Sequence, residues 1–160
     1  MKKTVPFSST TNMLIFEKGK ILLIKRDESL KDFPGWLMLP GGKQEYNETP
    51  KEAAIRETEE ETGLKASNPK IRVVATHYHY YKPKTYLVYI FTASKYAGTL
   101  IDIEEDKGTP VWMPVKKALN HPKLYPDLKR HIRMITNSKS DKLMFTYHKF
   151  NSDLKIEEER

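Results

Sequence analysis

The segment from Thr49 to Gly63 constrains the fold most, because it carries a complete set of signals for one helix. Thr49 can serve as the N-cap, Pro50 suits the first helical position, and Glu52 can complete a capping box with Thr49. Gly63 suits the left-handed residue that ends many helices. Most residues between them are Ala, Arg or Glu, which are good helix formers. The sequence therefore predicts a helix over 49–63.

Apolar and β-branched segments on both sides of this helix predict strands. Segments 12–16 and 20–26 are typical of a hairpin with Gly19 in its turn, and 71–81 and 86–94 of a second strand pair. The run 86–91 is apolar without alternation, which indicates a central strand buried on both faces. The remaining predicted elements are strands at 36–38, 110–113 and 143–150 and a helix at 126–136.

The length of 160 residues fits one domain, which we expect to span 12–150. Residues 1–11 are polar and lack periodicity, so we expect a flexible N-terminal arm. Residues 151–160 form a charged C-terminal tail outside this domain, and we expect 155–160 to fray.

Three carboxylates of the predicted helix share one face, because Glu57, Glu60 and Glu61 are spaced at i, i+3 and i+4. Adjacent carboxylates repel one another unless a cation neutralises them, and oxygen ligands suit Mg²⁺ or Mn²⁺. Arg56 could brace a carboxylate through two parallel hydrogen bonds, and Glu48 could fold back toward the same face. A Glu-rich helix more often exposes a charged face to solvent than it binds a metal. The spacing of residues over a longer segment is therefore needed to distinguish the two interpretations.

That wider spacing starts at Gly42 and follows G-x5-E-x7-R-E-U-x-E-E-x-G-U, where U is a bulky apolar residue. The fixed positions are all present, at Gly42, Glu48, Arg56, Glu57, Glu60, Glu61 and Gly63. Thr58 departs from the pattern at the first U, for which we expect a small effect on stability alone. The chain therefore resembles the Nudix hydrolases, in particular their MutT-like branch of small nucleotide pyrophosphohydrolases.

The resemblance implies an α/β (α+β) fold of the Nudix type, an α/β/α sandwich with a mixed sheet. It also implies a catalytic set of Arg56, Glu57, Glu60 and Glu61, in which the three glutamates hold Mg²⁺ or, as a substitute, Mn²⁺. Glu57 is in addition the leading residue of the motif for activating water. Glu48 would support the site, and the backbone of Gly41 and Gly42 would line it.

Outside the motif, the resemblance implies a further metal-binding carboxylate from a loop, and Glu104, Glu105 and Asp106 lie in one. We favour Glu105. Arg26 ends a strand that leads toward the motif, which suggests a phosphate contact. Asn120 follows the strand that contains Trp112, and its amide could read the edge of a base.

His77 and His79 are two residues apart and so share one face of a predicted strand. Zinc binding would need further convergent ligands, so we expect packing across the strands instead.

The net charge of +7 invites a nucleic-acid partner, but its distribution argues against one. The segment 45–61 carries −5 and the rest of the chain +12, an arrangement that suits capture of a metal-bound phosphoanhydride. Apolar runs long enough to span a membrane and a secretion signal are both lacking. The absence of cysteine excludes disulfides and agrees with a cytoplasmic location, and the resemblance allows a homodimer.

The predicted function is Mg²⁺-dependent hydrolysis of a nucleoside diphosphate linked to a group X. A nucleoside triphosphate, oxidised purine nucleotides included, is the leading substrate, giving a monophosphate and pyrophosphate. The motif leaves open a dinucleoside polyphosphate, an ADP-sugar or an RNA 5′ end. The alternative from another class is a non-catalytic module that binds a nucleotide or RNA.

Overall fold

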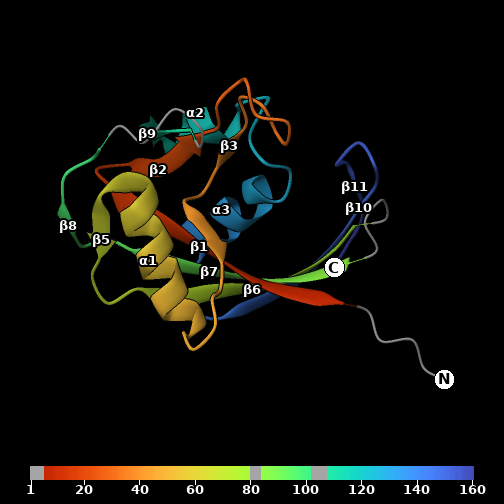
Figure 1. The fold of residues 1–160 in the computed structure, drawn as a ribbon, viewed down its shortest axis with the longest axis horizontal. Coiled ribbons are helices and arrows are strands. Elements are labelled where there is room, and N and C mark those ends of the chain that lie inside the picture. The colour runs from red at the N-terminus through yellow and green to blue at the C-terminus, as the bar shows by residue number, and fades with distance from the viewer. Residues whose placement is uncertain (1–5, 80–83, 102–107) are drawn as a thin grey trace.

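The computed structural model describes residues 6–79, 84–101 and 108–160 and shows a mixed sheet with helices on both faces (Figure 1). The nine-stranded sheet has the order β11-β10-β6-β7-β1-β2-β3, with β4 on β1 and β9 on β2. Strands β1 and β7 pair in parallel, as do β6 and β10, and the other pairs of this sheet are antiparallel. The strands are β1 (Phe7–Glu17), β2 (Lys20–Lys25), β3 (Leu37–Met38), β4 (Gly41–Lys43), β6 (Lys70–His79), β7 (Lys84–Ala93), β9 (Thr109–Pro114), β10 (Met144–Phe150) and β11 (Ile156–Glu159).

Helix α1 (Pro50–Thr62) forms as the local signals predict. The Thr49 side chain accepts a hydrogen bond from the Glu52 backbone N–H, and the Glu52 carboxylate accepts one from the Thr49 N–H, so the capping box is complete. Gly63 ends the helix in a left-handed conformation with φ of 74°. The other helices are α2 (Val115–Leu119) and α3 (Leu128–Asn137). A separate pair of strands, β5 (Leu64–Ala66) and β8 (Tyr96–Gly98), lies beside α1 (Figure 1).

Two apolar layers hold the helices against opposite faces of the sheet. On β1, Met13 and Ile15 point to the cluster that contains Ala54 of α1, whereas Leu14 points to the cluster that contains Ile132 of α3. This alternation follows from the two-residue period of a strand and explains why the middle of β1 is apolar throughout. The α/β/α sandwich predicted from the sequence is therefore confirmed.

The ends of the chain differ from the prediction. Residues 7–11 belong to β1, where Phe7 pairs with Thr85 and Thr10 with Val88 on β7, so the flexible arm does not extend over them. Ser and Thr supply little apolar burial, but their backbone groups complete two ladders, with β7 and with β4.

The charged C-terminus is also ordered into a strand. β11 pairs with β10, and the turn between them is held by the Asn151 side chain, whose Oδ1 accepts hydrogen bonds from the backbone N–H groups of Asp153 and Lys155. The structure contradicts the fraying expected over 155–160, because the glutamates there belong to a strand that is stabilised by its backbone ladder rather than by apolar side chains.

Among the helices that the structure describes, none is long and apolar enough to cross a membrane. The cytoplasmic location and the homodimer stay predictions.

Candidate active site

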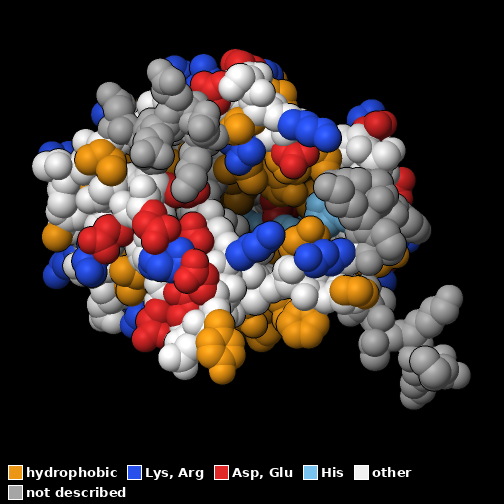
Figure 2. Space-filling view, in the orientation of Figure 1, with side chains coloured by type: hydrophobic (Ala, Val, Ile, Leu, Met, Phe, Trp, Pro, Cys, Tyr) orange, Lys and Arg blue, Asp and Glu red, His pale blue; other side chains and the backbone are white. Residues whose placement is uncertain are grey.

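The site begins at the carboxylate face of α1, where acidic side chains surround a basic one (Figure 2). Arg56 donates hydrogen bonds from Nη1 to Glu57 Oε1 at 2.9 Å and to Glu60 Oε2 at 3.2 Å. It also binds both oxygens of Glu48 through Nε and Nη2. The structure thus brings together four residues of the predicted site. Arg56 offsets the repulsion between the carboxylates of Glu48, Glu57 and Glu60.

The contacts between Arg56 and Glu48 also shift the pKa values of both groups. Hydrogen bonds from Arg56, and then from the backbone N–H of Glu45, lower the pKa of Glu48 below its usual range. The hydrogen bond to Glu48 in turn raises the pKa of Arg56. Both groups are therefore charged at neutral pH.

Strand β4 forms the other wall of the carboxylate face. It lies between β1 and α1, with Gly42 opposite Thr11, and the Gly41 N–H donates to Glu61 Oε2 at 2.8 Å. A Cβ at Gly42 would overlap the carboxylate of Glu57, so only glycine allows this close approach. Glu57 and Glu61 therefore face the glycine strand.

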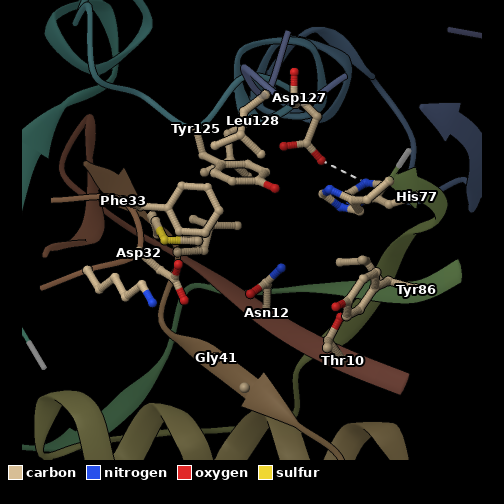
Figure 3. Close-up of a pocket in the computed structure, with 18 residues that line it drawn as sticks. Thr10, Asn12, Asp32, Phe33, Gly41, His77, Tyr86, Tyr125, Asp127 and Leu128 are labelled. Atoms are coloured by element: carbon tan, nitrogen blue, oxygen red, sulfur yellow. Dashed lines mark ion pairs between the residues drawn. The ribbon is translucent and has the colours of Figure 1, made fainter. Parts of the chain in front are cut away.

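A cavity of about 510 Å³ opens on the opposite side of the same glycines. Figure 3 shows Asn12 pointing into it from β1 and Tyr86 from β7, with Phe33 and Tyr125 on the opposite wall. Gly41 and Gly42 line the cavity and also contact Glu61 and Glu57, so the cavity and the carboxylate face share one wall.

Sequence reasoning missed most of the cavity, because its walls come from β1, β6, β7 and the segments before α1 and α3. A signal existed at Asn12, a polar residue at the edge of an apolar run. It also existed at Asp127, which directly precedes the periodic residues of α3.

The inner end of the cavity contains buried titratable groups. His77 Nε2 lies 2.9 Å from Asp127 Oδ2, and the two side chains point toward one another (Figure 3). Burial raises the pKa of Asp127, but His77 and then His131 outweigh that effect, so the net change is downward. The two further candidate donors near His77 are Asp127, which directly precedes α3, and His148 on β10, whereas His79 stacks on Phe150.

Three predicted residues lie elsewhere or outside the described chain. Arg26 donates from Nε to the Asp32 carbonyl at 3.0 Å, and it does not line the cavity. Asn120 donates to the Lys116 carbonyl at 3.0 Å, so its amide caps α2 instead of facing the cavity. Glu105 lies outside the described residues, as do its neighbours Glu104 and Asp106.

Comparison with known proteins adds sequence and fold similarity to this geometry. The NUDIX domain family matches residues 6–135. The chain is 30% identical over 115 residues to the uncharacterized Nudix hydrolase YvcI of Bacillus subtilis, covering 70% of this chain and 69% of that protein. It is 46% identical over 55 residues to the 8-oxo-dGTP diphosphatase of Haemophilus influenzae, covering 34% of this chain and 40% of that protein. Its fold is similar to that of a MutT protein of Bacillus halodurans, with a TM-score of 0.83 and 22% identity over 96% of both chains.

Proposed function

The chain belongs to the Nudix family of hydrolases, which act on nucleoside diphosphate derivatives, and from this premise we propose that it hydrolyses nucleoside triphosphates to a monophosphate and pyrophosphate. The observation that carries the proposal is the wall formed by Gly41 and Gly42, with the cavity on one side and carboxylates on the other. A nucleotide could place its base in the cavity and its phosphates at the carboxylate face. The basic remainder of the chain, at +12, would attract such a polyanion.

The carboxylate face fits a hard divalent ion. It offers oxygen ligands from one helix face, and the missing side chain at Gly42 leaves the Glu57 carboxylate close to the backbone of β4. We propose that Glu57, Glu60 and Glu61 hold Mg²⁺, with Mn²⁺ as a substitute. When bound, the ion would offset the negative charge of the diphosphate.

The protein groups divide the remaining work. Arg56 keeps Glu48, Glu57 and Glu60 at fixed positions, and Gly41 holds Glu61 through its backbone N–H. Glu57 is the proposed base, taking a proton from the water that attacks phosphorus as the phosphoanhydride bond breaks.

The cavity supports a nucleobase as the bound group. Three aromatic rings provide apolar faces for stacking: Tyr86, and the pair Phe33 and Tyr125, whose ring centroids are 5.5 Å apart. The amide of Asn12 can both donate to and accept from a base edge. The name of the Haemophilus relative leads us to include oxidised purine nucleotides among the proposed substrates.

A nucleotide panel with Mg²⁺ and identification of the products tests the proposal. We expect release of a nucleoside monophosphate, and a loss of about 100-fold or more in kcat/KM for Glu57→Gln and Glu60→Gln. Glu59→Gln is the matched control, because Glu59 lies on the same helix but pairs with Lys65 at 3.3 Å. Absence of turnover of every nucleoside diphosphate derivative by the folded protein would overturn the proposal.

The same panel decides among the alternatives within the family. It should include a dinucleoside polyphosphate, an ADP-sugar and a triphosphorylated RNA 5′ end. Salt-sensitive RNA binding without hydrolysis would instead indicate the non-catalytic module.

A further inference from the structure

Four buried side chains, two of which line the cavity, have no part in the proposed hydrolysis. We name them the histidine–aspartate cluster: His77 on β6, Asp127 before α3, His131 on α3 and His148 on β10. His77 and His148 are register partners on neighbouring parallel strands, so their side chains leave the same face of the sheet. Helix α3 covers that face and brings Asp127 and His131 against them.

The contacts inside the cluster are close. Asp127 Oδ2 lies 2.9 Å from His77 Nε2 and 3.4 Å from His131 Nδ1. The ring of His148 packs edge to face on those of His77 and His131, with centroids 5.3 and 5.0 Å apart. One donor atom from each of His77, Asp127 and His148 lies within 4.8 Å of the other two.

Several of these donor atoms are buried without a hydrogen bond. His148 is 0% exposed, and within the described residues neither of its ring nitrogens has a hydrogen-bond partner. The Glu159 carboxylate lies 3.9 Å from His148 Nε2, beyond hydrogen-bond range. Asp127 is 2% exposed, and its Oδ1 is likewise without a partner. A buried polar atom without a hydrogen bond destabilises the fold unless something satisfies it, so the cluster favours a bound ligand.

We propose that His77, Asp127 and His148 form a binding site for a divalent transition-metal ion of the Zn²⁺ type. Two imidazoles and one carboxylate are a recurrent donor set for zinc, with a further position open for water or another ligand. Ligands of a tetrahedral zinc ion lie about 3.3 Å apart. His77 Nε2 and Asp127 Oδ2 are already 2.9 Å apart, so side-chain rotation would mainly have to bring His148 closer to this pair. This site is distinct in chemistry from the all-oxygen face of α1, which suits Mg²⁺.

His131 has a positioning role in this arrangement. Its Nε2 shares a 3.0 Å hydrogen bond with Thr146 Oγ1, which fixes the ring while Nδ1 faces the Asp127 carboxylate. Because His77 and Asp127 line the cavity, an ion could reach the site from there (Figure 3). Once bound, it would link α3 to β6 and β10 and fix the floor of the cavity.

The test uses the full chain, stripped with a chelator and then held in millimolar Mg²⁺ to occupy the carboxylate face. Co²⁺ is added first, because four-coordinate cobalt has intense visible absorption bands, and Zn²⁺ is then used to displace it. We expect one equivalent of Co²⁺ with those bands, complete displacement by Zn²⁺, and a rise in Tm on adding Zn²⁺.

Variants assign the ligands. His148→Gln and Asp127→Asn should each weaken Zn²⁺ binding by about 100-fold, as measured by calorimetry in the Mg²⁺ background. His79→Gln is the matched control, a buried histidine of the same strand as His77 and outside the three-ligand group, and should stay within about three-fold. Circular dichroism checks that each variant is folded.

The wild-type titration with Co²⁺ and Zn²⁺ tests the site even where a variant does not fold. Weak absorption typical of six-coordinate cobalt would assign the ion to the carboxylates of α1 and overturn the proposal. So would the absence of saturable Co²⁺ or Zn²⁺ binding once Mg²⁺ is present, or unchanged affinity in folded His148→Gln.

Discussion

Arg56 binds Glu48 through two parallel hydrogen bonds, from Nε to Oε2 at 3.0 Å and from Nη2 to Oε1 at 2.8 Å. The remaining nitrogen, Nη1, is thereby directed at Glu57 and Glu60. One guanidinium thus anchors to the loop before α1 and sets the spacing of two carboxylates on the helix. The planar fork of arginine makes this arrangement, which a lysine ammonium cannot reproduce.

Arg56→Lys should therefore lower activity while retaining the charge. We expect kcat/KM to fall about 10- to 100-fold and the Mg²⁺ concentration needed for half-maximal activity to rise, because Glu57 and Glu60 lose their shared support. Steady-state kinetics over a range of Mg²⁺ concentrations measures both. Lys51→Arg, on the same helix and exposed, is the control and should behave as the wild type; equal activity of Arg56→Lys would contradict the positioning role.

Gly42→Ala should impair catalysis more than folding. The new Cβ would push the Glu57 carboxylate away from β4, and a displacement of about 1 Å can cost about 100-fold in rate. Gly19→Ala provides the contrast: Gly19 has φ of 76°, but among the described residues no atom other than those of its chain neighbours lies within 4 Å of the new Cβ. We expect it to lose about 1 kcal/mol of stability and keep its activity. Kinetics and urea unfolding of both variants separate the two effects.

The sequence could predict the elements that depend on local signals, and it could not predict those that depend on long-range pairing. Helix α1 and its carboxylate face follow from residues within one segment, from Thr49 to Gly63, so spacing alone locates them. β11 was not predictable, because its glutamates show no apolar pattern and its order comes from the ladder with β10. The pairing of His77 with Asp127 depends on how α3 packs on the sheet, which no local pattern encodes.

The buried imidazole of His131 should make stability depend on pH. Burial lowers the pKa of His131 to about 4, although Asp127 acts in the opposite direction. The unfolded chain, with a pKa near 6.5, then binds a proton that the folded chain does not bind. Stability should fall as pH drops from about 6.5 to about 4, by roughly 3 kcal/mol in total from this group.

Urea unfolding of chelator-treated protein across this pH range measures that loss. His131→Gln removes the titrating group, so its free energy of unfolding should vary less steeply with pH than that of the wild type. His121→Gln is the control, because His121 is not buried and should leave the slope unchanged. Parallel pH profiles for the wild type and His131→Gln would show that another group governs the loss.

Two asparagines test whether the base binds in the cavity or in the loop after β9, which the sequence favoured for base recognition. Asn12 points into the cavity from β1, whereas the amide of Asn120 is bound to the Lys116 carbonyl. Asn12→Ala should raise KM for the best nucleotide by about 10-fold, the value of one or two hydrogen bonds, with kcat within about three-fold. Asn120→Ala should leave both constants unchanged, apart from a small loss of stability at the end of α2. The reverse result, a raised KM in Asn120→Ala alone, would place the base in the loop after β9 and leave the cavity without its proposed occupant.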